Sequence, residues 1–363
     1  MASPALSRRA LVGSALALGA LPTRLFAETG ARLLAGTYTQ EGGPGLVPLT
    51  AGARGWTAGP ADAAIRNASF GVRSTVTGLR YLLDEQQQGG LGIYDAGHKR
   101  IGGGSTLGAD PCHAALSPDG ATLAVANYSS GSVALWRLDR RTGLPTGAPH
   151  SIAHEGSGPN RGRQAAPHAH WVGFAGNGLL HAVDLGADAI FAHRLEARGV
   201  GTTTIAYRAE PGSGPRHLAR HPRMPIAYLV AELANTVTIL QARPDGSFAA
   251  RGVVSTLPAG FNGASAAAHI ALNRAGTRLY VSNRGHDSIA VFAIASDGGL
   301  TPIQHAGCGG HWPRLFLLLE ARGELLVANQ RSGNVARLPM ERAGRLGTAS
   351  HGPTVPGVAF LAS

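Results

Sequence analysis

The stretch Leu116-Ser-Pro-Asp-Gly-Ala-Thr-Leu-Ala-Val-Ala-Asn-Tyr128 has a second copy at Leu272-Asn-Arg-Ala-Gly-Thr-Arg-Leu-Tyr-Val-Ser-Asn-Arg284. Each copy contains the end of one strand, a Pro- or Gly-containing turn, a second strand of alternating or β-branched residues, and then an asparagine. A third strand follows in both, at Ser132–Trp136 and Ser288–Phe292. Weaker copies span residues 221–240 and 319–337. The chain therefore repeats a unit made of short strands.

The beginning of this unit can be located seven times, at Asn67–Phe70, Pro111–His113, Pro167–His170, Pro215–His217, Ala267–His269, Pro313–Arg314 and Pro356–Val358. The starts are spaced by about 43 to 56 residues, a period typical of β-propeller blades with four short strands each. We predict an all-β, seven-bladed β-propeller that forms one domain over residues 28–363.

The two ends of the repeat array are incomplete in complementary ways. Only Val358–Leu361 follow the last start, which is enough for one strand. The segment Leu33–Tyr38 resembles a second strand but has no first strand before it. We expect the C-terminal strand to complete the blade that the N-terminal strands begin, so that the two ends share one blade and leave no open edge.

The first 27 residues resemble an export signal. Arg8 and Arg9 precede a weakly hydrophobic stretch that runs to Leu21, and Ala27 offers a cleavage site. A twin-arginine pair before a short apolar segment is typical of Tat signals, and the segment is too short to span a bilayer. We expect residues 1–27 to be removed on export to the periplasm, with no stable membrane insertion afterwards.

The composition limits the partners that the protein can have. The formal net charge is +11, but Lys99 is the one lysine and the arginines are scattered singly without a basic run. This pattern argues against nucleic-acid binding. Cys112 and Cys308 lie at the starts of different blades, so we expect two free thiols. We expect a monomer that uses no cofactor.

The strand order predicts where polar residues meet. In a propeller blade the innermost strand lines the channel and the next strand runs antiparallel to it, so first-strand starts and second-strand ends share one mouth of the channel. The starts carry His113, His168, His170, Arg216, His217, His269 and Arg314. The ends carry Glu85, Asn127, Asp184, Glu232, Asn283, Arg284 and Asn329. We predict a small-molecule site at this mouth, and we expect the mouth to be wet.

Several of these residues have a structural alternative. Asn127 and Asn329 recur at equivalent places and can satisfy backbone groups of turns, and Asp184 can equally be structural. His168 and His170 stand two residues apart on one strand and do not supply a full coordination set, so we predict no metal site. A calcium ion on the ring of carboxylates and amides is the second alternative, disfavoured by the neighbouring arginines.

At this point the chain resembles the bacterial lactonase family of propellers, which includes the propeller-type 6-phosphogluconolactonases and is similar to the fungal carboxymuconate cyclases. The matching motifs span nearly the whole mature chain and include Gly36–Thr39, Ser117–Gly120, Gln164 with Pro167–His170, Asp184–Gly186, Gly214–His217, Ala231–Leu233, Ser282–Ser288 and Ala328–Gln330. Two segments depart from the family pattern, Asn67-Ala-Ser69 and Leu83-Asp-Glu85, and the second puts a functional role of Glu85 in doubt.

The resemblance implies a lactone hydrolase with a catalytic set at His170, Arg216, Glu232 and Arg284. Substrate-binding residues are then expected at His168, His217, Asn127, Asp184, Arg314 and Asn329. Lactone opening needs a base to deprotonate water and a positive site for the oxyanion. Glu232 or His170 can be the base, and Arg216 with Arg284 can bind the oxyanion or an anionic substituent.

The sequence leaves two other functions open. A carboxymuconate cyclase-like enzyme would form a lactone instead of opening one, and a periplasmic propeller could bind an anionic ligand or a protein partner without catalysis. Export also leaves open an unphosphorylated sugar lactone, or another lactone, as the substrate. No Gly-x-Ser-x-Gly elbow is present, so we do not expect a covalent serine mechanism.

Overall fold

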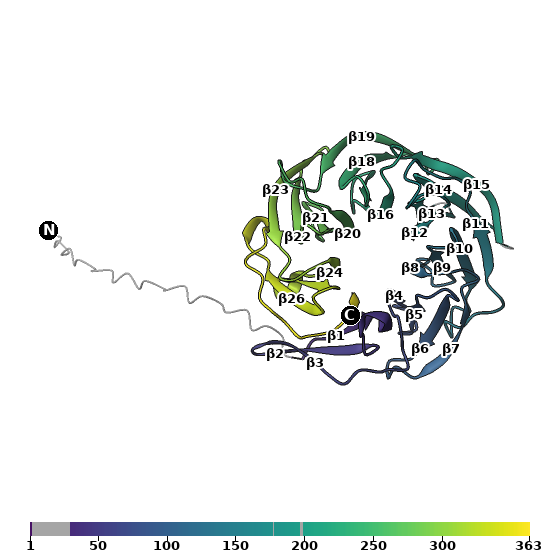
Figure 1. The fold of residues 1–363 in the computed structure, drawn as a ribbon, viewed down its shortest axis with the longest axis horizontal. Helices are drawn as coiled ribbons and strands as arrows, with labels where there is room; N and C mark the ends of the chain where they lie inside the picture. Colours follow the sequence, from purple (N-terminus) through teal and green to yellow (C-terminus); the bar gives the residue numbers. More distant parts are fainter. Residues whose placement is uncertain (2–29, 177, 197–198) are drawn as a thin grey trace.

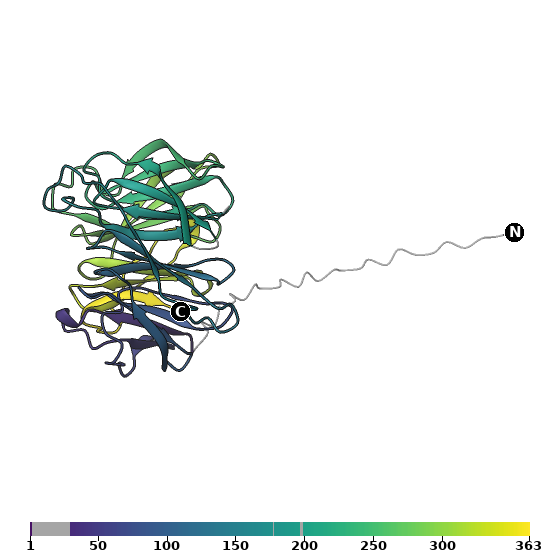
Figure 2. The same cartoon turned by 90° about the vertical axis from the view of Figure 1, so that its right-hand side faces the viewer.

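The computed structural model describes residue 1 and residues 30–176, 178–196 and 199–363, and these form a ring of seven sheets. Figure 1 views the ring along the channel, and Figure 2 turns it edge-on. The seven-bladed, all-β architecture is thereby confirmed. The export signal expected at residues 1–27 lies outside the described residues, apart from Met1.

Each blade is a meander of antiparallel strands that runs from the channel to the rim (Figure 1). Blade one consists of β4 (Gly71–Arg73), β5 (Arg80–Asp84), β6 (Gly90–Tyr94) and β7 (Arg100–Ser105). Blade two consists of β8 (Pro111–Leu116), β9 (Thr122–Asn127), β10 (Ser132–Arg137) and β11 (His150–Ala153). Blade three consists of β12 (Ala169–Phe174), β13 (Leu179–Asp184), β14 (Ala189–Glu196) and β15 (Gly199–Arg208).

The remaining blades follow the same order. Blade four consists of β16 (Pro215–Arg220), β17 (Ile226–Ala231), β18 (Thr236–Ala242) and β19 (Phe248–Ser255). Blade five consists of β20 (Ala266–Leu272), β21 (Arg278–Arg284), β22 (Ser288–Ile294) and β23 (Leu300–Gly307). Blade six consists of β24 (Pro313–Leu319), β25 (Glu324–Asn329) and β26 (Asn334–Pro339). Blade seven consists of β27 (Val358–Ala362), β1 (Arg32–Thr37), β2 (Val47–Gly52) and β3 (Gly55–Ala58).

Helical structure is slight. The described residues contain three short 3-10 helices, η1 (Thr39–Glu41), η2 (Glu320–Arg322) and η3 (Arg342–Gly344). No helix in the described part of the chain is long and apolar enough to cross a membrane.

The repeated turn and the strand after it explain why each unit folds alike. Gly120 and Gly276 have φ angles of 68° and 65°, and their N–H groups donate to the carbonyls of Ser117 and Asn273 at 2.9 Å in both turns. The left-handed conformation favours glycine there. The strand that follows, such as β9, is buried along its full length because neighbouring blades cover both of its faces.

The core lies between blades. Tyr228 and Ile239 of blade four pack in one cluster with Leu279 and Phe292 of blade five, and similar clusters lie between the other blades. Tyr228 also donates its hydroxyl hydrogen to the carbonyl of Gly298 in the next blade at 3.0 Å. Each blade buries an apolar face against its neighbours, and this burial is the main stabilising term for the ring.

The two ends of the chain close the ring as the sequence predicts. Strand β27 pairs antiparallel with β1, and the register places Leu361 opposite Ala35 and Phe360 opposite Gly36. Gly36 is needed at this seam, since an added Cβ would lie 1.8 Å from the carbonyl oxygen of Ala68.

Blade six differs from the four-stranded expectation. After β26 the chain makes only isolated bridges to the blade, such as Arg337 with Ser350, and no fourth strand is formed among the described residues. Gly352 and Pro353 interrupt the segment, and an added Cβ on Gly352 would lie 2.0 Å from the carbonyl oxygen of Val335. The outer edge is therefore covered irregularly.

The structure confirms that Cys112 and Cys308 are free thiols, and both are buried. Cys112 lies at the start of blade two as expected, but Cys308 follows the outer strand β23 of blade five and does not begin a blade. Burial raises the pKa of Cys308 to about 12 and also raises that of Cys112. A thiol that is both buried and protonated reacts slowly with disulfide reagents.

We therefore expect no rapid reaction with Ellman's reagent in the folded protein and two thiol equivalents after denaturation without reductant. A spectrophotometric thiol count measures both values. One equivalent or none after unfolding would contradict this prediction.

Candidate active site

Three arginines surround one carboxylate at the channel mouth. Glu232 follows β17 directly, and its Oε2 atom accepts from Arg216 Nε at 3.0 Å and lies 2.7 Å from Arg284 NH2. Its Oε1 atom accepts from Arg163 NH2 at 2.7 Å. Arg163 precedes blade three, Arg216 and Glu232 belong to blade four, and Arg284 ends a strand of blade five. We call these four residues the arginine–glutamate cluster.

Three of the four residues are buried, which corrects the expectation of a wet mouth, and only the side chain of Arg163 is partly exposed. Glu232 is 3% exposed, Arg216 is 2% exposed and Arg284 is 6% exposed. Burial by itself raises the pKa of Glu232, but Arg284 and Arg216 outweigh it and hold the pKa well below its usual range. Glu232 is therefore an anion at neutral pH, in surroundings where charge interactions are strong.

Backbone carbonyls hold two of the guanidiniums in place. Arg216 NH1 donates to the carbonyl of Ala268 at 2.8 Å, and Arg284 donates to the carbonyls of Ala266 and Ala267 at 3.2 Å each. Burial, followed by repulsion from Arg284, lowers the pKa of Arg216 to about 9, so it remains a cation at neutral pH. The two arginines are thus fixed hydrogen-bond donors at the base of the mouth.

A β-bulge recurs at the start of the innermost strands. The pairing register shifts between Pro111 and His113, between Ala169 and Trp171, between Pro215 and His217, and between Pro313 and Leu315. The residues within these shifts are Cys112, His170, Arg216 and Arg314. A bulge inserts one residue, bends the strand and re-aims a side chain. Along a regular strand, consecutive side chains point to opposite faces. The bulges therefore explain how consecutive polar residues can both reach one mouth.

Histidine rings lie against the cluster and line the channel. His217 accepts from Arg216 NH1 at its Nε2 atom, 3.2 Å away, and its ring lies 5.2 Å from that of His170 and 5.3 Å from that of His113. His269 joins the group through a 3.4 Å contact between its Nδ1 atom and that of His217. Burial, and then Arg216, lowers the pKa of His170 and His217 well below 6.5. These imidazoles are neutral at neutral pH.

A second carboxylate lies at the same mouth. Glu85 Oε2 accepts from the Tyr38 hydroxyl at 2.7 Å, and Glu85 Oε1 lies 3.6 Å from Arg314 NH2. Arg314 also stands 5.1 Å from the centre of the Tyr38 ring. Burial lowers the pKa of Arg314, but Tyr38 and Glu85 outweigh it and raise the pKa overall. Glu85, which the unusual Leu83-Asp-Glu85 segment put in doubt, therefore has a defined place beside the site.

The structure places the other expected binding residues differently. His168 stacks on Tyr128 at 4.5 Å, and the Tyr128 hydroxyl accepts from Arg163 at 3.1 Å, which connects His168 to the cluster. Asn127 and Asn329 are fully buried, and each donates to the carbonyl that ends the preceding blade, at Thr106 and Cys308. These two amides tie adjacent blades together.

Asp184 is also fully buried. It accepts from the backbone N–H groups of His168 and Ala187 at 2.7 and 2.9 Å, and it contacts His154 Nδ1 at 2.7 Å. These bonds hold the loop that carries His168. Asp184 thus has a structural role, because it stabilises a loop of the mouth.

Sequence reasoning missed Arg163 and the tyrosines Tyr38 and Tyr128. Arg163 lies in a loop before the strand start, next to the motif residue Gln164, and that adjacency was the available signal. Tyr38 lies in the Gly36–Thr39 motif and Tyr128 follows a repeated asparagine, so the repeats contained a signal for both.

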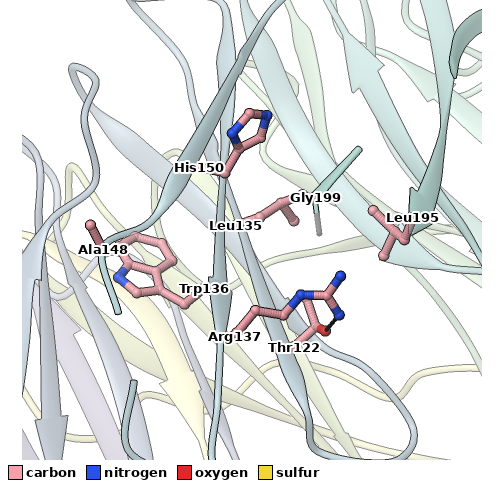
Figure 3. A pocket seen from close by; sticks show the side chains of 8 residues that line it. All are labelled: Thr122, Leu135, Trp136, Arg137, Ala148, His150, Leu195 and Gly199. Atoms are coloured by element: carbon pink, nitrogen blue, oxygen red, sulfur yellow. Dashed lines mark hydrogen bonds between the residues drawn. The ribbon is translucent and has the colours of Figure 1, made fainter. Parts of the chain in front are cut away.

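The cluster suits an anionic or electron-rich ligand. A cation bound at Glu232 would lie among three guanidiniums, which disfavours the calcium alternative. A separate pocket lies between blades two and three, away from the cluster, and Figure 3 shows its lining by Thr122, Leu135, Trp136, Arg137, Ala148, His150, Leu195 and Gly199. None of the expected site residues lines it.

A family model described as Lactonase, 7-bladed beta-propeller, matches residues 32–362. The chain belongs to this lactonase family. A curated relative in Bacillus subtilis (strain 168), named 6-phosphogluconolactonase, is 32% identical over 328 residues, which are 86% of this chain and 92% of the relative.

Solved structures agree with the family. A protein from Lactobacillus plantarum has a TM-score of 0.84 and 28% identity, covering 92% of this chain and 99% of that chain. A Pseudomonas aeruginosa protein titled periplasmic gluconolactonase has a TM-score of 0.84 and 26% identity, covering 91% of this chain and 98% of its own. The lactonase fold is thus shared along almost the whole chain.

Proposed function

We propose that this chain is a lactone hydrolase that opens a sugar lactone of the 6-phosphogluconolactone type at the channel mouth. The observation that carries the proposal is the arginine–glutamate cluster, which lies beside neutral His170 at the mouth. Membership of the lactonase family and the names of the Bacillus and Pseudomonas relatives support it.

The reaction is acyl transfer to water. A base takes one proton from water as the oxygen adds to the lactone carbonyl carbon, and negative charge moves to the carbonyl oxygen. Arg216 and Arg284 are fixed donors suited to that charge. The carbon–oxygen bond of the ring then breaks, and the departing ring oxygen takes up the proton. Water is thus consumed and one hydroxy acid is formed.

Of the two candidate bases, we favour His170. The charge of Glu232 is engaged with three guanidiniums, which makes it a poor proton acceptor. The ring of His170 is neutral, so one of its two ring nitrogens can receive the proton, and its Nδ1 atom lies 3.7 Å from the Cys112 thiol. Glu232 then serves to position Arg216 and Arg284.

The direct test is a pH-stat assay of purified protein with 6-phosphogluconolactone and gluconolactone. Base uptake above the spontaneous rate is expected for at least one of them. The substitution Glu232→Gln controls for catalysis by a contaminating enzyme, since activity of this chain should fall with it. The absence of hydrolysis of either lactone by the parent would overturn the proposed function.

We further propose that the protein is exported by the Tat route to the periplasm. The support is the Arg8-Arg9 pair before a weakly apolar segment, together with a relative titled as periplasmic. Replacing both arginines by lysine should leave full-length precursor in the cytoplasm, because the Tat receptor reads the pair. Cell fractionation with size analysis measures this. Unchanged periplasmic delivery of the double variant would contradict Tat routing.

A further inference from the structure

Trp312 lies at the rim of the site in a constrained backbone. Its φ angle is 68°, a left-handed conformation that is rare for a bulky residue. Its N–H donates to Asp287 Oδ1 at 2.8 Å, and its carbonyl accepts from the N–H of Gln330 at 3.1 Å. The second oxygen of Asp287 contacts His311 Nδ1 at 2.8 Å. Contacts on both sides of the residue therefore hold Trp312 in place, as is common where strain serves a function.

The indole ring connects the buried cluster to an exposed arginine. The guanidinium carbon of Arg284 lies 5.6 Å from the centre of the Trp312 ring, and that of Arg331 lies 3.3 Å from it. Arg331 follows β25, whose C-terminal end is at the same mouth as the cluster. The guanidiniums of Arg284 and Arg331 thus share one aromatic ring as a cation–π partner.

The charge of Arg331 is available, unlike that of the other mouth arginines. Arg163, Arg216 and Arg284 pair with Glu232, and Arg314 pairs with Glu85. Arg331 is exposed, and within residues 30–176, 178–196 and 199–363 it makes no ion pair. Its guanidinium carbon lies over the Trp312 ring, 3.3 Å from the ring centre. A guanidinium that is held on an aromatic face and has no anionic partner can bind an anionic ligand.

We propose that Arg331, positioned by Trp312, binds the phosphate group of a phosphorylated sugar lactone while Arg216 and Arg284 hold the lactone carbonyl. Arg331 is then a specificity-determining residue, and Trp312 is its positioning residue. This inference rests on the proposed lactone hydrolase function. It assigns recognition of the phosphate to a residue outside the buried cluster, at the exposed rim.

The test compares two lactones on the parent and on Arg331→Gln. The KM for 6-phosphogluconolactone should rise about tenfold with kcat nearly unchanged, because loss of one charge-assisted contact weakens binding and not chemistry. The KM for gluconolactone, which has no phosphate, should stay the same. Trp312→Leu should reproduce part of the rise. Arg342→Gln is the matched control, since Arg342 is an exposed arginine of η3, beyond the end of β26 on the opposite face of blade six.

The outcomes separate this proposal from the proposed function. Equal changes in KM for both lactones, or no change for either, would overturn the role of Arg331 while leaving the hydrolase intact. If the parent hydrolyses neither lactone, the phosphate subsite can still be tested by measuring the binding of 6-phosphogluconate and gluconate with calorimetry. Tighter binding of the phosphorylated acid by the parent, lost in Arg331→Gln, would support the phosphate subsite. Equal binding of both acids by the parent would refute it.

Discussion

Replacing Glu232 by Gln, or Arg216 by Ala, is expected to lower kcat/KM for lactone hydrolysis by about a hundredfold or more, as loss of an oxyanion partner commonly does. Without the carboxylate charge, three guanidiniums lose their common partner, and Arg216 and Arg284 shift relative to the carbonyl they polarise. The assay is steady-state kinetics at neutral pH. Full activity of both variants would remove these residues from the catalytic assignment.

The burial of Glu232 and Arg216 also makes these variants less stable, whereas substitutions in a wet mouth would change stability little. Breaking a buried ion pair by removing one partner costs about 3–5 kcal/mol of unfolding free energy. Activity must therefore be expressed per folded molecule, with the folded fraction measured by circular dichroism.

Glu324 offers a matched control. It is 2% exposed and also has two arginine partners, Arg322 and Arg337, but it begins β25 at the opposite face from the cluster. Glu324→Gln should lower stability and leave the kcat/KM of the folded fraction unchanged.

The second large effect expected is acid destabilisation by buried neutral histidines. Five buried histidines have pKa values lowered first by burial, namely His113, His170, His181, His193 and His217. Burial lowers the pKa of His181 to about 4 and that of His193 to about 3. In the unfolded chain each titrates near its ordinary value of about 6.5.

The sign follows from proton binding. Between pH 6.5 and the lower folded-state values, the unfolded chain binds more protons than the folded one, so the free energy of unfolding falls as the pH falls. Above pH 6.5 the contribution is fully present. Each histidine lowers the free energy of unfolding by up to about 1.4 kcal/mol per pH unit. The protein should therefore lose several kcal/mol of unfolding free energy between pH 6.5 and 5. Urea unfolding at a series of pH values measures the slope.

A single-site variant checks the assignment. His193→Gln should reduce the slope by about one proton, whereas His150→Gln, at an exposed site of β11, should leave it unchanged. A free energy of unfolding that stays constant from pH 7 to 5 would contradict burial of neutral imidazoles.

The repeats explain why the fold could be predicted from the sequence. A turn such as Ser117–Gly120 is defined by local residues, and a strand such as Thr122–Asn127 shows its burial in its own composition. Ring closure was also predictable, because Val358–Leu361 and Leu33–Tyr38 are each incomplete without the other. All these signals are local or come from comparing one unit with another.

The geometry of the mouth was harder to predict from the sequence. Strand order alone predicted that Arg216, Glu232 and Arg284 would share a mouth, and their contacts confirm it. Arg163 lies in a loop outside the repeat, so periodicity carried no information about it. The bulges at the strand starts depend on hydrogen bonding between two strands, so no single stretch of sequence predicts them. The burial of the cluster depends on residues from three blades.

The shared blade has a consequence for how the molecule assembles. Blades one to six each pair strands that are neighbours along the chain, whereas β27 must find β1 from the other end of the polypeptide. Contacts between such distant segments are slow to form, because the loop to be closed is long. During synthesis the seam stays open until β27 (Val358–Ala362) is available to pair with β1. The mouth, which draws on residues from both sides of the seam such as Tyr38 and Arg314, is therefore completed late.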